Sequence, residues 1–417
     1  MVAKIKKYLK TLGPGWITGA SDDDPSGIGT YSYAGSRYGL GLLWTMLFSM
    51  PLMSAVQEMC ARIAQVSGMG LGAVMKHHIP RRPLCALVLL LVGANTINIA
   101  ADIGAMAAAT QLLAPLPFFF LALVFTIVTL VLEIFVSYRV YSRYLKFLTL
   151  SLVAYIVVAL IITTDWASVA RATLVPSLQF SKDFFLVLVA ILGTTISPYL
   201  FFWQASTEVE EEITHGRITP LQRRGATRDE IRDMRIDVIS GMVFSNIVAF
   251  FIMLTAAVVL YPGGIVIQTA QDAAAALGPV AGEYASLLFS LGIIATGLLA
   301  IPVLAGSASY AVSEIFGWKS GLYRKLREAH GFYGVITIAT LIGLLINALG
   351  ADPIRMLLWT AVLNGVVAPI ILTAIIGIAN NTKIMGKWRN GPLSNFLNGL
   401  TLIVMTASIL LMIVFLQ

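Results

Sequence analysis

Charged residues are scarce in this chain. Of its 417 residues, 12% are Asp, Glu, Lys or Arg and 58% are hydrophobic, and the mean hydropathy is +0.85. Soluble domains carry about 25% charged residues, so this composition excludes that class and indicates a multi-pass membrane protein. Because no polar stretch is long enough to fold separately, we predict a single all-α transmembrane domain over residues 1–417.

Cysteine and histidine are also rare. The two cysteines, Cys60 and Cys85, are too few for a disulfide framework or a thiolate metal site. All four histidines fall between the apolar segments rather than inside them, at His77, His78, His215 and His330. The chain shows neither the nucleophile nor the histidine-rich metal cluster that a membrane enzyme needs, so we expect no enzyme activity and no cofactor.

Basic residues exceed acidic ones, 28 to 21, which gives a net charge of +7. The lysines and arginines gather in short loops, so they indicate membrane topology and attraction to lipid rather than nucleic-acid binding. One connection, residues 261–283, contains no Lys or Arg. By the positive-inside rule we expect a cytoplasmic N-terminus and an external C-terminus in a plasma or inner membrane.

Eleven apolar segments are each long enough to cross a bilayer as a helix. They are residues 13–36, 39–66, 82–113, 116–138, 144–164, 183–206, 236–262, 282–315, 331–349, 353–379 and 393–416. The longest polar stretch between them, residues 208–235, carries charges of both signs and predicts a solvated cytoplasmic connection.

The first of these segments contains an acidic run. Asp22, Asp23 and Asp24 are consecutive, and Pro25 follows them directly. A charged side chain near the bilayer centre costs from about 3 to more than 10 kcal/mol, so three acids there require a specific reason. We interpret the run as part of a cation site.

A second break lies five segments later, where Pro198 interrupts the stretch from Thr194 to Tyr199. Proline removes a backbone donor and frees carbonyl groups that a cation can satisfy. Two breaks five segments apart predict a five-plus-five inverted repeat. The repeats would span residues 13–164 and 183–379, with an extra helix at 393–416.

Six motifs follow one another with a characteristic spacing. They are Gly13-Pro14-Gly15, Asp24-Pro25-Ser26-Gly27, Ala34-Gly35, Gln57-Glu58-Met59-Cys60-Ala61-Arg62, Ala101-Asp102-Ile103-Gly104 and the stretch from Gly193 to Ser206. With these motifs the chain resembles the Nramp divalent-metal transporters. The resemblance implies a LeuT-type inverted repeat with broken helices 1 and 6, eleven transmembrane helices, and a divalent cation as the transported substrate.

Departures from the family pattern change the expected ligands. The Nramp pattern on the first helix is Asp-Pro-Gly-Asn; here Asp24 keeps the carboxylate and Gly27 takes the place of the asparagine. The pattern on the sixth helix is Met-Pro-His; here Ser197 and Tyr199 replace the methionine and the histidine. The chain thus lacks the amide and the soft thioether ligand of the family.

The remaining oxygen ligands favour hard cations. Carboxylate, carbonyl, hydroxyl and water oxygens suit Mg²⁺, Ca²⁺ and Mn²⁺, whereas thioether sulfur suits softer ions. Gly27 and Ser197 are also small, so we expect a wide site for an ion that keeps several waters, as Mg²⁺ does. The combination resembles the branch of Nramp-related magnesium transporters, which implies transport of Mg²⁺ and Mn²⁺.

Asp24 is the principal candidate ligand. The candidate metal-site residues are Asp23, Asp24, Gly27, Thr194, Thr195 and Ser197, and the candidates for the pathway or a gate are Asp22, Tyr199, Asp102, Asn364, Glu58 and Arg62. The resemblance places Thr194 where a backbone carbonyl binds the ion. The hydroxyls near the sixth-helix break either hold waters of the ion or bond to freed carbonyl groups. Asp22 and Asp23 either add negative charge to the cavity or bond to a neighbouring helix.

The proton relay that the resemblance implies is depleted here. Asp102 keeps the aspartate of the third helix, but Ala105 takes the place of the glutamate that follows it, and Tyr199 and Gln204 stand at the two histidine positions. We therefore predict facilitated transport without proton coupling. A divalent ion gains about 4.6 kcal/mol moving inward across about 100 mV, so coupling is not physically required.

Other polar residues in the apolar segments are weaker candidates. Glu58 and Arg62 are four residues apart, which predicts an intrahelical or gate-forming ion pair. Asn95, Asn98, Asn347 and Asn364 either line the pathway or form hydrogen bonds between helices. Asn364 precedes Pro369 in the tenth segment and is the strongest of the four.

Three other functions remain open. A proton-coupled Mn²⁺ or Fe²⁺ Nramp symporter would share the fold, but it should show the methionine, the asparagine and intramembrane histidines. An organic-cation or amino-acid carrier of the same architecture is a second possibility, although the acidic run disfavours an anionic substrate. A membrane enzyme or sensor would need chemistry or an output domain that the sequence does not show. We expect membrane lipid and the divalent cation as partners, with no nucleic acid and no obligate protein partner.

Overall fold

The computed structural model describes residues 13–136 and 152–415, and every regular element within them is helical. The longer helices are α2 (Pro14–Ala20), α3 (Pro25–Tyr38), α4 (Trp44–Ser67), α6 (Arg81–Gln111), α7 (Phe118–Phe135), α9 (Val153–Ile162), α11 (Lys182–Thr195), α12 (Pro198–Thr214), α14 (Arg228–Val259), α17 (Ala285–Phe316), α18 (His330–Ala348), α19 (Pro353–Asn380) and α21 (Pro392–Val414). Shorter elements are α5 (Leu71–His78), α10 (Trp166–Leu174), α13 (Pro220–Arg223), α15 (Ala270–Ala275), α16 (Gly278–Ala281), α20 (Thr382–Met385), η1 (Gly39–Leu42), η3 (Tyr261–Gly263), η4 (Gly282–Tyr284) and η5 (Gly386–Trp388).

Eight helical stretches in the described ranges are long and apolar enough to cross a membrane. They are Arg81–Gln111, Phe118–Phe135, Lys182–Thr214, Arg228–Gly263, Gly278–Phe316, His330–Ala348, Pro353–Asn380 and Pro392–Val414. A ninth arises if Pro25–Leu42 and Trp44–Ser67, which are bent by 109° at their junction, are taken together. The prediction of an all-α, multi-pass membrane protein is confirmed.

Three of the eleven expected spans account for the difference in number. The first, residues 13–36, is divided into the short helices α2 and α3, and the second corresponds to α4, which meets the criterion only together with α3. The fifth, residues 144–164, lies partly outside the described residues, which contain only the ten-residue apolar helix α9. Acidic and small residues in the broken first helix lower its hydropathy, so a polar site makes the span harder to recognise.

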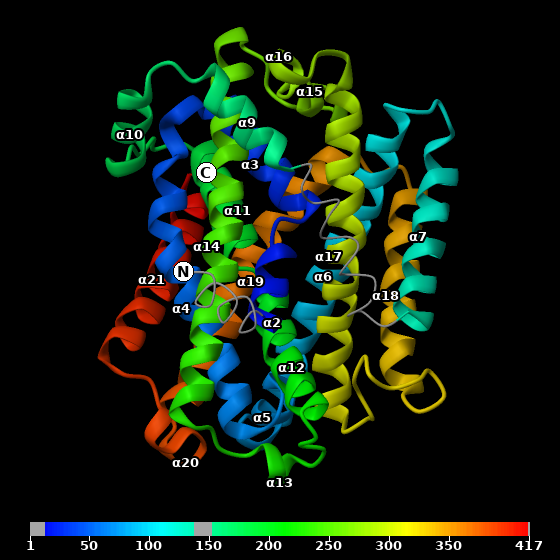
Figure 1. Ribbon diagram of the computed structural model, residues 1–417, viewed down its shortest axis with the longest axis vertical. Coiled ribbons are helices and arrows are strands. Elements are labelled where there is room, and N and C mark those ends of the chain that lie inside the picture. Colours follow the sequence, from blue (N-terminus) through cyan, green and yellow to red (C-terminus); the bar gives the residue numbers. More distant parts are fainter. Residues whose placement is uncertain (1–12, 137–151, 416–417) are drawn as a thin grey trace, which may run out of the picture.

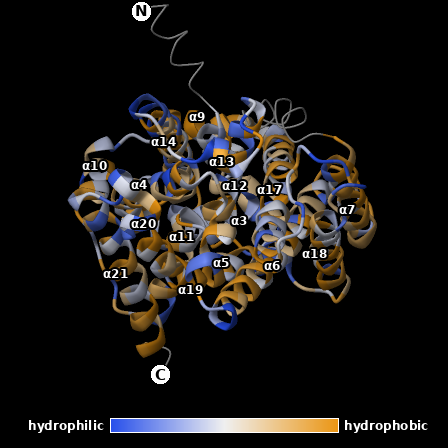
Figure 2. Ribbon diagram, turned by 90° about the horizontal axis from the view of Figure 1, so that it is seen from below, coloured by the Kyte–Doolittle hydropathy of each residue, from blue (hydrophilic) through white to orange (hydrophobic). Residues whose placement is uncertain are grey.

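The outward faces of the peripheral helices are apolar. Figure 2 shows hydrophobic residues along α7, α18 and α21 at the edge of the bundle. Large side chains such as Phe120, Ile338 and Ile403 are exposed there. Exposed apolar surface of this kind suits contact with lipid chains.

The polar connection 208–235 is more helical than expected. α12 continues to Thr214, α13 follows, and α14 already begins at Arg228. The Thr227 hydroxyl accepts a hydrogen bond from Glu230 N at 3.2 Å, and Glu230 Oε2 accepts one from Thr227 N at 2.7 Å. This capping box starts the helix eight residues before the apolar segment begins, so the connection is helical at both of its ends.

Both predicted helix breaks are present. Residues 21–24 separate α2 from α3, and Ile196 and Ser197 separate α11 from α12. In Figure 1 both breaks lie near the middle height of the bundle, between the end with α5, α13 and α20 and the end with α15 and α16. The second half of each broken helix starts at a proline, Pro25 or Pro198, where the missing N–H group costs no helical hydrogen bond.

Glycine allows both broken helices to pack closely on an unbroken partner. α2 and α3 lie against α14, and a Cβ atom on Gly19 would come within 2.2 Å of the carbonyl oxygen of Gly241. α11 lies against α19, and a Cβ atom on Gly193 would come within 2.0 Å of the carbonyl oxygen of Ala361. Any side chain at either glycine would separate the backbones, so α14 and α19 fix the positions of the two breaks.

Candidate metal site

Asp24 begins α3 and lies at the first break. Its Oδ1 atom accepts hydrogen bonds from Gly27 N at 2.6 Å and from Ser26 Oγ at 2.9 Å, so the carboxylate caps the helix. Aspartate directly before a proline at the first helical position is a favoured way to start a helix. The residue is only 1% exposed although it is an acid.

Two other helices contribute donors to the same carboxylate. Asn98 Nδ2 on α6 donates to Asp24 Oδ2 at 3.1 Å, and Tyr199 Oη on α12 donates to it at 3.4 Å. No Lys, Arg or His of the described ranges forms an ion pair with Asp24. A buried carboxylate in this setting lacks a positive counter-charge and has oxygen- and nitrogen-bearing groups around it.

Gly27 leaves a gap between Asp24 and the second break. A Cβ atom on Gly27 would lie 3.1 Å from Thr194 Oγ1 and 3.4 Å from Asp24 Oδ1. The Thr194 hydroxyl is buried and has no hydrogen-bond partner in the part of the chain that the structure describes. An unpartnered hydroxyl oxygen and a carboxylate oxygen therefore border the same small space.

The other two hydroxyls at the second break are engaged with the backbone. Thr195 Oγ1 donates to the Ile191 carbonyl at 2.7 Å, and Ser197 Oγ lies 2.8 Å from the carbonyl oxygens of both Gly193 and Thr194. Hydroxyl groups commonly bond to carbonyls in this way near a helix end. Of the two roles considered from the sequence, the structure shows backbone bonding for Thr195 and Ser197.

Asp22 and Asp23 lie against a different helix from Asp24. Ser245 Oγ on α14 lies 2.7 Å from Asp22 Oδ2 and 3.3 Å from Asp23 Oδ1. Both acids are buried, and Asp22 Oδ1 has no hydrogen-bond partner among the described residues. Of the two roles that the sequence allowed for Asp22 and Asp23, the structure shows hydrogen bonding to a neighbouring helix. Their partner, Ser245, is not among the partners of Asp24.

Two further candidates are buried, and their side chains form no hydrogen bond with any residue that the structure describes. Asp102 on α6 lies close to the Asp24 carboxylate and to the backbone N–H of Ser26, but neither of its oxygens makes a hydrogen bond. Asn364 on α19 is 1% exposed, and neither of its polar side-chain atoms has a partner. Buried polar atoms without partners are uncommon, so both residues stay candidates for the pathway.

A complete cage of charged ligands is not present. In the part of the chain that the structure describes, no group of three or more His, Cys, Asp or Glu residues is placed to hold a metal ion. The surroundings of Asp24 instead offer one carboxylate with amide and hydroxyl groups. Mg²⁺ commonly binds through one or two carboxylates and keeps several of its waters, so this donor set suits a hydrated hard ion.

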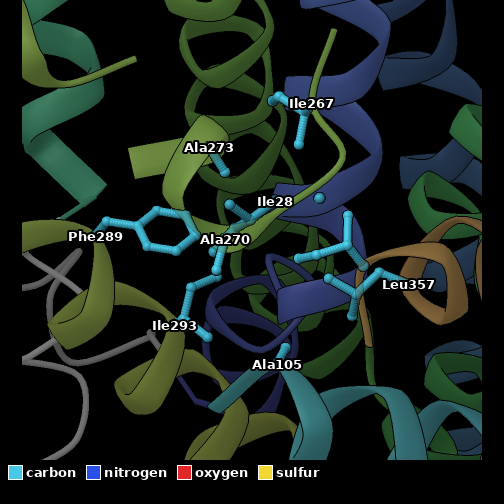
Figure 3. Close-up of a pocket in the computed structure, with 10 residues that line it drawn as sticks. Ile28, Ala105, Ile267, Ala270, Ala273, Phe289, Ile293 and Leu357 are labelled. Carbon is cyan, nitrogen blue, oxygen red and sulfur yellow. The ribbon is translucent and has the colours of Figure 1, made fainter. Parts of the chain in front are cut away.

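An apolar pocket adjoins the site on the side of α15. Ile28 and Gly29, which directly follow Gly27, line it together with Ala105 of α6 and residues of α15, α17 and α19. Figure 3 shows Ile267 above and Ala105 below Ile28, with only carbon atoms on the side chains that border the pocket. The side chains of this lining offer no ligand to an ion.

Glu58 and Arg62 form the expected ion pair within α4. Arg62 Nε lies 2.9 Å from Glu58 Oε1, and Arg235 Nε on α14 lies 2.8 Å from the same oxygen. Arg62 Nη2 also donates to Asn390 Oδ1 at 2.7 Å. The group ties α4 to α14 and to the segment before α21, and none of these contacts involves Asp24.

The sequence does not single out Asn98 and Ser245, the hydrogen-bond partners of the acids at the first break. Asn98 lies four residues before Asp102 on α6, so helical spacing alone could have placed both on one face. Ser245 follows the first break by more than 200 residues in an apolar helix, and no local pattern marks it. These contacts depend on the packing of distant helices.

Comparisons with known proteins agree with this architecture. The family model described as natural resistance-associated macrophage protein-like, Nramp, matches residues 15–415. The divalent metal cation transporter MntH of Caldanaerobacter subterraneus is 24% identical over 409 residues, which cover 94% of this chain and 90% of the relative. MntH of Deinococcus radiodurans is 27% identical over 396 residues, which cover 92% of this chain and 84% of the relative.

Solved structures show the same fold at low identity. A manganese transporter of Eremococcus coleocola matches with a TM-score of 0.77 and 17% identity, over 97% of this chain and 86% of that one. Mhp1, a nucleobase-cation-symport-1 family transporter, matches with a TM-score of 0.60 and 14% identity, over 97% of this chain and 89% of that one. All four proteins are named as transporters and none as an enzyme. Since the family model spans nearly the whole chain, the protein belongs to the Nramp family.

Proposed function

We propose that this protein carries divalent cations across the membrane, with Mg²⁺ and Mn²⁺ as its substrates. The relatives named as divalent metal cation transporters and the neighbour named as a manganese transporter support the class of substrate. The observation that carries the proposal is the position of Asp24. It is a buried carboxylate where two broken helices meet, with amide and hydroxyl groups around it and no basic partner among the described residues.

The preference for hard ions follows from the donor atoms. Asp24 supplies the negative charge, Thr194 supplies a free hydroxyl, and the absent side chain of Gly27 leaves space between them. Oxygen donors with this spacing favour an ion that retains water, whereas a soft ion gains nothing from them. Thr195 and Ser197 shape the second break, and Asp22 and Asp23 add negative charge to its surroundings.

The transport step is alternating access. Asp24 is only 1% exposed, so an ion bound there can exchange only after the helices around it move. In transporters built from inverted repeats, one repeat rocks against the other around a site near the midplane. We assign the repeats to residues 13–164 and 183–379, with α21 outside them.

The scarcity of proton-carrying side chains around Asp24 supports transport without proton coupling. Asp102 is close to Asp24, but Ala105, one turn further along α6, contributes only carbon to the apolar pocket. The histidines lie at the ends of α5, α12 and α18 and do not reach Asp24. The ion gradient and the membrane potential supply the driving force.

The orientation in the membrane follows from the basic residues. α5, α13 and α20 lie at one end of the bundle in Figure 1 and carry lysines or arginines, whereas α15 and α16 at the opposite end carry none. We assign the first end to the cytoplasm, which gives a cytoplasmic N-terminus and an external C-terminus in a plasma or inner membrane. Lipid contacts the apolar outer faces of α7, α18 and α21.

Ion uptake into proteoliposomes tests the proposal. Wild-type protein is supplied with Mg²⁺, Mn²⁺ or Ca²⁺ under an imposed inside-negative potential, with a pH dye inside the vesicles. Asp24→Asn is the informative variant, because asparagine still caps a helix but carries no charge. Asp165→Asn is the matched control. Asp165 also caps a helix, through Ser168 N at 3.0 Å, and its hydrogen bond to Ser168 lowers its pKa, so it is a charged but exposed cap.

The outcomes separate the parts of the proposal. We expect uptake of Mg²⁺ and Mn²⁺ that follows the potential, does not acidify the lumen, and disappears in Asp24→Asn but not in Asp165→Asn. Uptake of Mn²⁺ that excludes Mg²⁺ and carries protons would overturn the uncoupled, hard-ion part and favour a proton-coupled symporter. Wild-type protein that moves none of the three ions would overturn divalent cation transport itself.

A further inference from the structure

We propose that Asn98 is a ligand of the transported cation and positions the Asp24 carboxylate. This inference rests on the proposed cation transport. It adds a residue of α6 to the ligands that the two broken helices supply. Its starting point is the contact of Asn98 Nδ2 with Asp24 Oδ2 at 3.1 Å. The amide on α6 thus contacts the carboxylate that caps α3.

The amide oxygen of Asn98 is free. Asn98 is 0% exposed, and its Oδ1 atom has no hydrogen-bond partner within residues 13–136 and 152–415. Because the nitrogen and the oxygen share one carbon, Oδ1 lies no more than about 5.5 Å from Asp24 Oδ2. Two oxygens at that separation can bind one hydrated Mg²⁺ or Mn²⁺, directly or through its waters.

The contacts of Asn98 differ from those of the other buried asparagines. Asn95, also on α6, donates to the Leu304 carbonyl on α17, and Asn347 on α18 donates to the Ala100 carbonyl on α6. Their amide oxygens are also free, but their nitrogens join helices through the backbone. Only the Asn98 nitrogen among these three reaches a carboxylate, so its free oxygen is the one beside the candidate ion.

A neutral amide suits a site that must release its cargo. The Nδ2 hydrogen bond holds Asp24 Oδ2, while Asp24 Oδ1 stays directed toward Gly27 and borders the gap next to Thr194. The amide oxygen then adds a ligand without adding charge. In oxygen sites the number of charged ligands tunes affinity for the cation, so one carboxylate with a neutral amide gives moderate binding and ready release.

The test measures the concentration dependence of Mg²⁺ and Mn²⁺ uptake in proteoliposomes, together with thermal stabilisation of the detergent-solubilised protein by Mn²⁺. Asn98→Leu removes the amide at nearly constant volume. Asn98→Asp keeps an oxygen and adds charge. Asn95→Leu is the control, since it removes a buried amide from the same helix without touching Asp24.

A ligand role predicts opposite effects of the two Asn98 variants. We expect Asn98→Leu to raise KM for both ions about tenfold or more, as loss of a group beside a metal site typically does. Asn98→Asp should leave KM equal to or below that of the wild type, because an added carboxylate attracts a dication more strongly. Asn95→Leu should leave KM within about twofold of the wild-type value, since its contact is with a carbonyl.

Two results would overturn the inference while the proposed function stands. One is a wild-type KM in Asn98→Leu, and the other is an increased KM in Asn98→Asp that matches the effect of leucine, which would indicate a packing role. Asn98→Asp decides the question if the leucine variant does not fold. Failure of the proposed function would appear instead in the wild-type protein, as an absence of uptake and of stabilisation by Mn²⁺.

Discussion

Asp237 on α14 caps the N-terminus of α2, and its Oδ2 atom accepts a hydrogen bond from Gly15 N at 2.7 Å. Its Oδ1 atom accepts two more, from Gly13 N at 2.8 Å and Trp16 N at 3.0 Å. The first turn of a helix presents free N–H groups and a partial positive charge, which a carboxylate satisfies. Gly13 at the N-cap position has no side chain to do this, so the cap comes from another helix.

Asp237→Ala should therefore destabilise the first half of the broken helix. Three backbone N–H groups lose their acceptor, and each buried donor left without a partner costs about 1–3 kcal/mol unless water reaches it. We expect a lower midpoint of thermal unfolding for the purified protein in detergent, with partial recovery in Asp237→Asn. Asp233→Ala is the control on the same helix, because the ion pair of Asp233 within the described ranges is with the exposed Arg232. Equal midpoints for the two alanine variants would contradict the capping role.

The contact of Asp237 also shows where sequence reasoning ends. Asp237 was included in an expected apolar segment, and more than 220 residues separate it from the turn that it caps. Eight of the expected spans and both breaks could be predicted because hydrophobic runs and prolines are local signals. A cap supplied by another helix leaves no local signal.

Gly241→Ala should disturb the same interface by a different mechanism. A Cβ atom there would lie 2.2 Å from the Gly15 carbonyl oxygen, so α2 and α14 would have to move apart. Overpacking of this kind costs about 1–3 kcal/mol, and we expect lower thermal stability and slower ion uptake. Gly93→Ala on α6 is the control, since a Cβ at Gly93 meets nothing within 4 Å and alanine favours a helix. Comparable losses in both variants would show that helix–helix distance is not the cause.

Arg62→Ala should be among the most destabilising changes outside the site. Arg62 is 2% exposed and bonds to Glu58 and Asn390, so its removal leaves buried polar groups without partners. Loss of one partner of a buried pair costs about 3–5 kcal/mol, although Arg235 still faces Glu58 here and reduces the effect. Unfolding in detergent, followed by tryptophan fluorescence, measures the change. Arg232→Ala, which removes an exposed arginine, is the control, and an equal effect from it would contradict a buried network.

The candidate site was predictable only in part. Asp24 stands out in the sequence because an acid beside a proline in an apolar segment is rare, and the structure places it at the break. The roles of Thr195 and Ser197 could not be assigned in advance, because a hydroxyl at a helix break can face either the cavity or a freed carbonyl. The direction of each hydroxyl depends on the backbone geometry of the break, which the sequence does not give. In the structure, both hydroxyls bond to backbone carbonyls.

Ser197→Met should shift selectivity toward softer ions. The serine hydroxyl now bonds to the Gly193 and Thr194 carbonyls, and methionine would replace it with a thioether at the second break. Sulfur favours softer transition metals over Mg²⁺, and a tenfold change in relative affinity needs only about 1.4 kcal/mol. We expect Zn²⁺ to inhibit Mn²⁺ uptake at about tenfold lower concentration than in the wild type, and Mg²⁺ uptake to fall. Ser197→Ala separates the two causes, because it removes the hydroxyl without adding sulfur. If alanine and methionine change inhibition by Zn²⁺ equally, the effect comes from the lost hydrogen bonds, and residue 197 does not set selectivity through its donor atom.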